Sequence, residues 1–185
     1  MEIGRNHILT IPNLVPTEML ETIDAYIRTL PKPERKAVDF KKDIPNPNIQ
    51  SIIEYIRDTS YKAIQEELLA PLGLKVKRII FEEEAQIARF SEEADLPSHS
   101  DCPQWEFELP YFDVTTLLYL NEDYKGGEIY FDDYGFEYKP VKGELLIFPS
   151  YFYHGTREIL PLDAASGYAQ RASVPFFWSL EVEPV

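Results

Sequence analysis

The 185-residue chain is 44% hydrophobic and 14% aromatic, which indicates a globular protein and excludes a disordered one. Its 32 acidic residues against 18 basic ones give a net charge of −14, which repels polyanions and argues against a nucleic-acid partner. The sequence has no apolar run of about 18 residues, so no membrane span is expected. A single cysteine excludes an internal disulfide, and no secretory signal is visible, so a cytoplasmic location is expected.

The first 72 residues predict two helices after a short strand at residues 8–16. Apolar side chains recur at three- and four-residue intervals over residues 17–30, with Thr17 as the expected N-cap. A second apolar stripe runs over residues 48–69. Residues 31–47 are charged and contain prolines, so a loop is expected there. Both helices are expected to brace one face of a sheet and to carry no site.

From residue 74 onward, short β-type stretches alternate with turns that contain glycine or proline. Strands are expected at residues 74–81, 84–90, 114–120, 128–131, 136–138, 144–149 and 171–182. Many short strands after two helices predict an α+β fold that is mainly β, a jelly roll with N-terminal bracing helices. We expect a single domain over residues 1–185, with the helical brace at about 14–72 and the jelly-roll core at about 76–182.

Three side chains in this region could bind a metal. His99 and Asp101 are two residues apart in a stretch expected to be extended, where alternate side chains share a face, and His154 follows an apolar strand. Two imidazoles and one carboxylate with other positions open are the ligand set of non-haem Fe(II) oxygenases, although Zn or Mn also accepts these donors. Cys102 is expected to point to the opposite face from Asp101, and His7 to have a surface or packing role.

Several motifs accompany these residues in a fixed order. They are His99-Ser100-Asp101, Thr116 to Asn121, Gly126-Gly127-Glu128, Gly143 to Pro149, His154-Gly155, and Arg171 ahead of Phe176-Phe177-Trp178. In this order they resemble the Fe(II)/2-oxoglutarate-dependent dioxygenase superfamily, and within it the prolyl 4-hydroxylase branch, over residues 76–182. The resemblance implies a cupin-like double-stranded β-helix, the jelly roll already expected from the strand pattern.

The resemblance also implies roles for single residues. His99, Asp101 and His154 would bind Fe(II), with 2-oxoglutarate and O2 in the remaining positions. Arg171 would bind the far carboxylate of 2-oxoglutarate, because a guanidinium can hold a carboxylate through two parallel hydrogen bonds. Its separation from His154 is longer than is usual in that branch, which leaves Arg157 as a rival.

Other pocket residues follow from the same resemblance. Tyr119 would contact the far carboxylate through its hydroxyl, and Leu117 would line the pocket. Thr116 and Trp178 are further candidates for the pocket wall. Phe90 stands where the branch often has a tyrosine, so it could pack against the co-substrate but could not donate a hydrogen bond.

The reaction implied is decarboxylation of 2-oxoglutarate to succinate and CO2, coupled to hydroxylation of a C–H bond, with ascorbate as a reductant. The substrate implied is a prolyl residue of a peptide or protein. The alternatives are a free amino acid or other small molecule, or a jelly-roll binding protein without catalysis. Aromatic residues in the segment 102–111 would either grip a peptide at the pocket mouth or pack into the core. A monomer or weak homodimer is expected, with no nucleic-acid or membrane partner.

Overall fold

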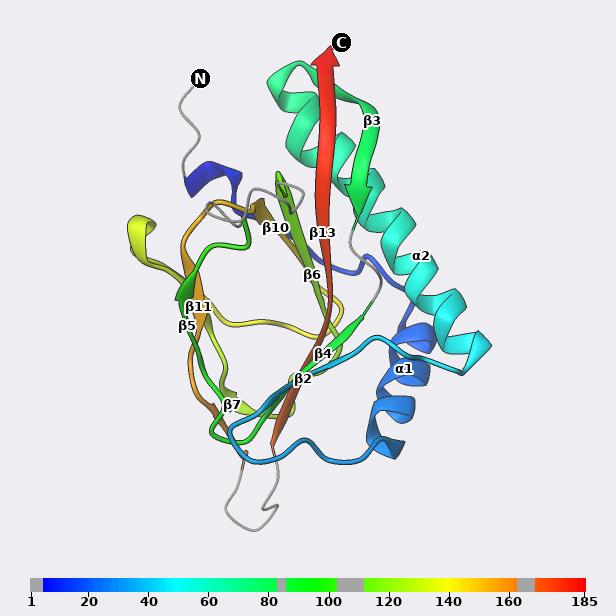
Figure 1. Cartoon of the computed structure of the whole chain (residues 1–185), viewed down its shortest axis with the longest axis vertical. Coiled ribbons are helices and arrows are strands. Elements are labelled where there is room, and N and C mark those ends of the chain that lie inside the picture. The colour runs from blue at the N-terminus through cyan, green and yellow to red at the C-terminus, as the bar shows by residue number, and fades with distance from the viewer. Residues whose placement is uncertain (1–4, 83–85, 103–111, 163–168) are drawn as a thin grey trace.

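Helices and strands follow one another in this computed structural model nearly in the predicted order (Figure 1). The structure describes residues 5–82, 86–102, 112–162 and 169–185. The helical elements are η1 (Arg5–His7), α1 (Thr17–Thr29), α2 (Pro47–Ala63), the π-helical η2 (Ile64–Leu69) that continues α2, and the short η3 (Ala70–Leu72) and η4 (Asp132–Tyr134). The strands are β1 (Leu9–Ile11), β2 (Val38–Lys41), β3 (Leu74–Glu82), β4 (Ile87–Ser91), β5 (Leu96–His99), β6 (Val114–Tyr119), β7 (Lys125–Gly126), β8 (Ile129–Phe131), β9 (Phe136–Tyr138), β10 (Leu145–Pro149), β11 (His154–Thr156), β12 (Ile159–Leu160) and β13 (Gln170–Pro184).

The strands form two main antiparallel sheets. The larger one has the order β1-β10-β6-β13-β4-β2, and β3 also pairs with β13. The smaller sheet has the order β5-β11-β8-β9, and β12 pairs separately with β7. Figure 1 shows α1 and α2 on one side of the larger sheet, with β5 and β11 on the other. This is the expected jelly roll with bracing helices, mainly β in content.

The central strand β13 separates a structural core from a pocket by simple alternation, because successive side chains of a strand point to opposite faces. Its helix-facing residues belong to the main apolar core together with α1 and α2, and these are Ala172, Val174, Phe176 and Trp178. Its other face lines a pocket between the sheets through Arg171, Ser173, Pro175 and Phe177. On β6, Leu118 likewise faces the helices while Leu117 lines the pocket.

The helices bury isoleucine-rich stripes against the larger sheet. Ile53 and Ile56 of α2 and Ile23 of α1 are almost fully buried, and each such side chain contributes about 1.5–3 kcal/mol through burial. The helix α2 begins one residue earlier than predicted, because the side chain of Asn46 accepts hydrogen bonds from the first backbone N–H groups. The predicted N-cap at Thr17 is wrong: it is the first helical residue, and the capping position before it is a proline without a side-chain bond.

An edge strand of the larger sheet lies where a loop is predicted. The strand β2 falls within residues 31–47 and pairs with β4 at the edge of the larger sheet, with Phe40 opposite Ala88. Four residues of alternating type between charged and proline-rich flanks are too short for a clear period, so the pattern could not indicate this strand. Part of the predicted strand 84–90, and the segment 102–111 apart from Cys102, lie outside the described residues.

The helices α1 and α2 lie within the predicted brace, and β3 to β13 cover the predicted core and extend two residues beyond each of its ends. The assignment of residues 1–185 to one domain stays a prediction. Among the described residues, none of the helices combines the length and the apolar character that crossing a membrane requires.

Two glycines with similar backbone angles provide a test of the packing between β7 and β12. Gly126 (φ +65°) lies so close to the carbonyl of Glu158 that an added Cβ would collide with it, whereas Gly135 (φ +54°) faces open space. Gly135→Ala should lower the free energy of unfolding by about 1–2 kcal/mol, which is the cost of the left-handed conformation. Gly126→Ala should cost roughly 1–3 kcal/mol more, because the backbone must also move. Urea denaturation of both variants measures this difference, and equal losses would contradict the close approach.

Candidate active site

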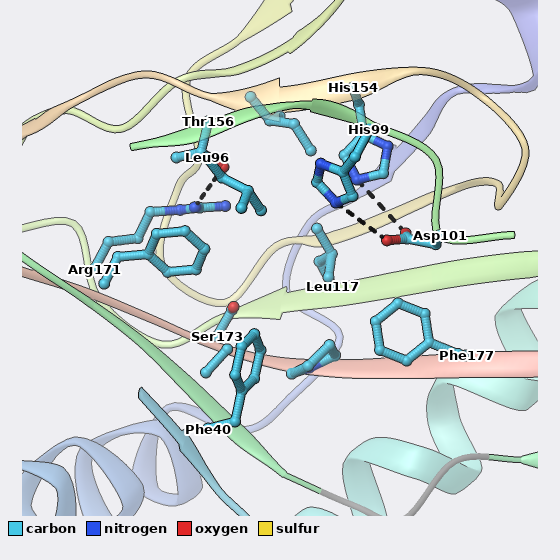
Figure 2. Close-up of a pocket in the computed structure, with 14 residues that line it drawn as sticks. Phe40, Leu96, His99, Asp101, Leu117, His154, Thr156, Arg171, Ser173 and Phe177 are labelled. Carbon is cyan, nitrogen blue, oxygen red and sulfur yellow. Dashed lines mark hydrogen bonds and ion pairs between the residues drawn. The ribbon is translucent and has the colours of Figure 1, made fainter. Parts of the chain in front are cut away.

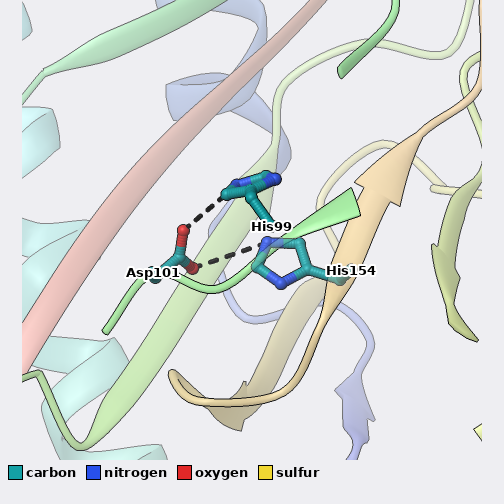
Figure 3. A group of neighbouring side chains, drawn as sticks. All are labelled: His99, Asp101 and His154. Atoms are coloured by element: carbon teal, nitrogen blue, oxygen red, sulfur yellow. Dashed lines mark ion pairs between the residues drawn. The ribbon is translucent and has the colours of Figure 1, made fainter. Parts of the chain in front are cut away.

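Three potential metal ligands come together at one end of the smaller sheet (Figure 3). His99 ends β5 and His154 begins β11, and the two strands pair with these residues opposite each other. The Nε2 atoms of His99 and His154 lie 3.4 and 3.5 Å from the two carboxylate oxygens of Asp101. Potential ligand atoms of all three residues lie within 4.8 Å of one another. The structure therefore unites the three residues that the sequence singles out.

The predicted reason for this grouping is wrong in one respect. His99 and Asp101 do not share one extended strand, because β5 ends at His99 and Asp101 lies in the bend that follows. The backbone N–H of Asp101 donates to the carbonyl of Ser150 at 3.0 Å, which turns the carboxylate toward the imidazoles. The three side chains therefore meet through the pairing of β5 with β11 and the hydrogen bond from Asp101 to Ser150, and not through alternation of side chains along one strand. Cys102 is buried and is not part of the ligand group.

Backbone carbonyls orient both imidazoles. The Nδ1 atoms of His99 and His154 lie 2.9 Å from the carbonyl oxygens of Pro97 and Phe152. A carbonyl can only accept a hydrogen bond, so Nδ1 carries a proton, and in the neutral ring Nε2 has a free lone pair that faces Asp101. This is the arrangement in which a histidine is ready to bind a metal.

The charges of the group also suit a divalent cation. Burial lowers the pKa of His154, which favours the neutral ring that binds metals. At His99 burial works against the charged form, but the contact with Asp101 outweighs it and raises the pKa. Asp101 has no Lys or Arg partner within the described part of the chain. A metal ion between the three side chains would supply the missing positive charge and displace the proton from His99.

A pocket extends from the metal-ligand group into the space between the sheets (Figure 2). The triad lies near one end of the pocket and Arg171 at the other. Most of the wall is apolar, and it comes from both sheets. Besides the triad and Arg171, it consists of Phe40, Ala88, Phe90, Leu96, Leu117, Ile129, Thr156, Ser173, Pro175 and Phe177.

Arg171 is a buried cation without an anionic partner among the described residues. Its side chain is 2% exposed, and its Nη atoms donate to the hydroxyls of Thr156 at 3.0 Å and Tyr119 at 3.2 Å. Its Nε has no partner, and the ring of Phe90 lies 4.7 Å from the guanidinium carbon. Within the described ranges no carboxylate forms an ion pair with it. Because a buried charge is costly unless it is paired, this end of the pocket is built for an anion.

The rival arginine lies elsewhere. Arg157 is on the outside of the smaller sheet, where its 53% exposed side chain forms an ion pair with Glu137 at 2.9 Å and stacks on the ring of Tyr130. Of the two arginines, only Arg171 lines the pocket. The extra length between His154 and Arg171 is taken up by β12 and by a segment that includes residues outside the described ranges.

Thr116 and Trp178, both expected in the pocket wall, lie on the opposite face of the larger sheet. The hydroxyl of Thr116 accepts a hydrogen bond from the indole of Trp178 at 3.1 Å, and both side chains are fully buried on the helix side of the sheet. The alternation of β6 turns Leu117 into the pocket and Thr116 away from it. Tyr119 lies on the pocket side at Arg171, and burial raises the pKa of its hydroxyl, which keeps it protonated.

Other residues of the pocket wall were not predicted from the sequence. Thr156 is two residues beyond His154 on β11, so alternation alone could have placed it on the same face. Ser173 is related to Arg171 in the same way on β13. No comparable signal was available for Phe40, because it lies on the unpredicted strand β2, far from every motif.

A jelly roll that gathers two imidazoles and a carboxylate next to a buried arginine has the architecture of a non-haem metal oxygenase. The sequence model of the 2OG-Fe(II) oxygenase superfamily matches residues 85–178, which is half of the chain, and the chain belongs to this superfamily. This confirms the resemblance found in the motifs. Family membership implies Fe(II), 2-oxoglutarate and O2 as cofactors.

Solved structures with the same fold include several prolyl hydroxylases. A viral collagen prolyl hydroxylase of Paramecium bursaria Chlorella virus-1 in complex with 2-oxoglutarate has a TM-score of 0.69 and 15% identity, over 97% of this chain and 96% of its own. A Trichoplax adhaerens prolyl hydroxylase bound to a peptide of hypoxia-inducible factor has a TM-score of 0.61 and 15% identity, over 94% and 84%. HygX of Streptomyces hygroscopicus with nickel, 2-oxoglutarate and hygromycin B has a TM-score of 0.57 and 16% identity, over 94% and 82%. These identities establish the fold alone. No curated protein matches the chain by sequence.

The unpaired charge of Arg171 leads to a prediction about stability. Arg171→Met replaces a buried cation by an apolar side chain of similar length. In the absence of ligand, the variant should therefore be as stable as the parent protein or more stable by up to about 4 kcal/mol. The variant should lose the stabilisation that 2-oxoglutarate gives, which for the parent is about 2.7 kcal/mol at 100 times its dissociation constant. Urea unfolding with and without 2-oxoglutarate measures both effects.

Arg157→Met is the matched control. It removes an exposed ion pair, so its stability should change by no more than about 1 kcal/mol, and its response to 2-oxoglutarate should be that of the parent. An Arg171→Met protein that is stabilised by 2-oxoglutarate as strongly as the parent would show that the anion binds elsewhere.

Proposed function

We propose that the chain is an Fe(II)- and 2-oxoglutarate-dependent hydroxylase in which His99, Asp101 and His154 bind the metal. Arg171 binds the far carboxylate of 2-oxoglutarate, assisted by the hydroxyls of Tyr119 and Thr156. The observation that carries the proposal is a buried guanidinium that pairs with no carboxylate of the described residues, in the same pocket as the three metal-ligand side chains. A cation at one end and a metal site at the other suit a dicarboxylate whose second end reaches the metal.

Bound Fe(II) supplies the oxidative decarboxylation of 2-oxoglutarate and the hydroxylation of a C–H bond. The protein positions the reactants. Arg171 can hold the far carboxylate through two parallel hydrogen bonds, and its present hydroxyl partners, Tyr119 and Thr156, each have a proton to donate to the same anion. Leu117 and Phe90 add apolar surface to the pocket wall, Phe90 beside the guanidinium of Arg171, and this surface excludes water and strengthens the pairing.

The pocket wall favours a residue within a peptide or protein over a free amino acid. A free amino acid carries an ammonium and a carboxylate near its side chain, and both need partners when they are buried. Among the described wall residues, the charged ones are the three metal ligands and Arg171, all of which the proposal already occupies. Phe40, Pro175 and Phe177 instead offer apolar surface, which suits an uncharged ring such as that of proline.

Two of the solved structures have different molecules bound and agree with different kinds of substrate. The Trichoplax neighbour is bound to a peptide, in agreement with a prolyl substrate, whereas HygX is bound to hygromycin B, which keeps a small-molecule substrate as the alternative. A binding protein without catalysis is disfavoured, because all three metal-ligand side chains and the buried Arg171 are present in one pocket. Ascorbate as a reductant, a cytoplasmic location and a monomer or weak homodimer stay predictions from the sequence.

The first test is spectroscopic. Anaerobic addition of Fe(II) and 2-oxoglutarate to the parent protein should produce a weak visible charge-transfer band, and aerobic turnover should release succinate. His99→Ala should abolish both signals, because it removes one of three metal ligands. His7→Ala, a change to the histidine outside the ligand group, should leave both intact. A folded parent protein without the band would exclude the proposed cofactor site.

A second test concerns the substrate. Phe40 is 51% exposed although it lines the pocket, so its exposed face is available to the substrate. Phe40→Ala should raise the KM for a proline-containing peptide roughly tenfold, equivalent to about 1.4 kcal/mol, while the KM for 2-oxoglutarate stays the same. Tyr55→Ala, at an exposed aromatic residue of α2 on the other side of the sheet, is the control. Equal effects of both variants on the peptide KM would remove Phe40 from the substrate site.

A further inference from the structure

The carboxylate of Asp101 is hydrogen-bonded to a buried chain of two hydroxyl groups. The hydroxyl of Thr115 donates to Oδ2 of Asp101 at 2.8 Å, and it lies 2.9 Å from the hydroxyl of Ser150. Thr115 and Ser150 are fully buried. A carboxylate only accepts, so the single proton of Thr115 points to Asp101, and Ser150 must donate to Thr115. The chain therefore runs in one direction, from Ser150 through Thr115 to the carboxylate.

The backbone around Ser150 completes this support. Its carbonyl accepts from the N–H of Asp101 at 3.0 Å and from the hydroxyl of Ser100 at 3.1 Å, and its N–H donates to the carbonyl of Asp113 at 3.1 Å. Thr115 belongs to β6 and Ser150 directly follows β10, two strands paired in the larger sheet. The larger sheet thus fixes a side chain that lies in the bend after β5 of the smaller sheet.

We propose that Thr115 and Ser150 are positioning residues that present Asp101 to the metal through one oxygen. The inference rests on the proposed metal site. The hydrogen bond from Thr115 takes up one lone pair of Oδ2, which also lies 3.5 Å from Nε2 of His154, whereas the nearest imidazole nitrogen to Oδ1 is Nε2 of His99 at 3.4 Å. Oδ1 is therefore the oxygen that the hydroxyl chain leaves available to a metal. An ion held by two imidazoles and one carboxylate oxygen keeps its remaining positions open, as oxygen chemistry at such a site requires. A carboxylate free to rotate and bind through both oxygens would close one of them.

Thr116 provides a matched control on the same strand. It is also fully buried, and its hydroxyl is also hydrogen-bonded, to the indole of Trp178 and the carbonyl of Phe176. It faces the helices instead of the metal-ligand group. Thr116→Val therefore removes a buried hydroxyl at equal depth without touching Asp101, and it separates the effect of lost stability from the effect on the metal.

The test uses Co(II) alone, added anaerobically to the full chain, with affinity and the visible d–d spectrum as readouts. Thr115→Val should weaken Co(II) binding by about 10–100-fold, the usual cost of losing a partner of a metal ligand, and should alter the spectrum. Thr115→Ser keeps the hydroxyl and should restore both. Thr116→Val should bind Co(II) as the parent does, even where its unfolding midpoint falls as far as that of Thr115→Val.

The outcomes separate this inference from the metal site itself. A parent protein that binds Co(II), together with a Thr115→Val variant of the same affinity and spectrum, would overturn the positioning role alone. A folded parent protein without Co(II) binding would overturn the metal site and this inference with it. Should Thr115→Val fail to fold, Ser150→Ala removes the next link, and it must weaken Co(II) binding by several-fold for the proposal to stand.

Discussion

From Arg171 to Trp178, each side chain of β13 lies in one of two environments, because this part of the strand runs through the middle of the larger sheet with helices on one face and the pocket on the other. Alternation fixes the choice for all of these residues at once. The apolar residues from Ala172 to Trp178 that anchor the helices therefore determine that Arg171 and Ser173 point inward. A slip of one residue would bury tryptophan in the pocket and arginine in the core, so stability and the site depend on the same register.

The pocket carries opposite charges at its two ends. Asp101 is an anion without a cationic partner among the described residues, and Arg171 is a buried cation without an anionic one. Neither charge neutralises the other, because each lies at its own end of the pocket. In the proposed function, a divalent metal complements the first and a dicarboxylate the second. Ligands that bind only the folded state stabilise it, so this unfavourable arrangement in the ligand-free protein becomes favourable when both are bound.

The motifs predicted much of the site because its residues follow one another in a characteristic order, and all of them except Asp101 lie on strands. His99, Asp101, His154 and Arg171 could be selected from residue type, order and resemblance, and the structure brings them to one pocket. Thr116 was misplaced because a run of apolar and hydroxyl residues does not reveal which face is inward when both faces are buried. The support from Ser150 depends on a contact between residues far apart in the chain, which no local pattern indicates.

The edge strand β2 has a consequence for how this protein can change over evolution. It lies between the two helices, outside the segment 85–178 that defines the family, yet it contributes Phe40 to the pocket wall. It is an edge strand, and β4 is the strand of the larger sheet with which it pairs. Mutations in these four residues can therefore reshape the entrance while the strands that carry His99, His154 and Arg171 stay unchanged. If the proposed function is correct, part of the substrate surface lies on a segment separate from the metal ligands and can be selected independently of them.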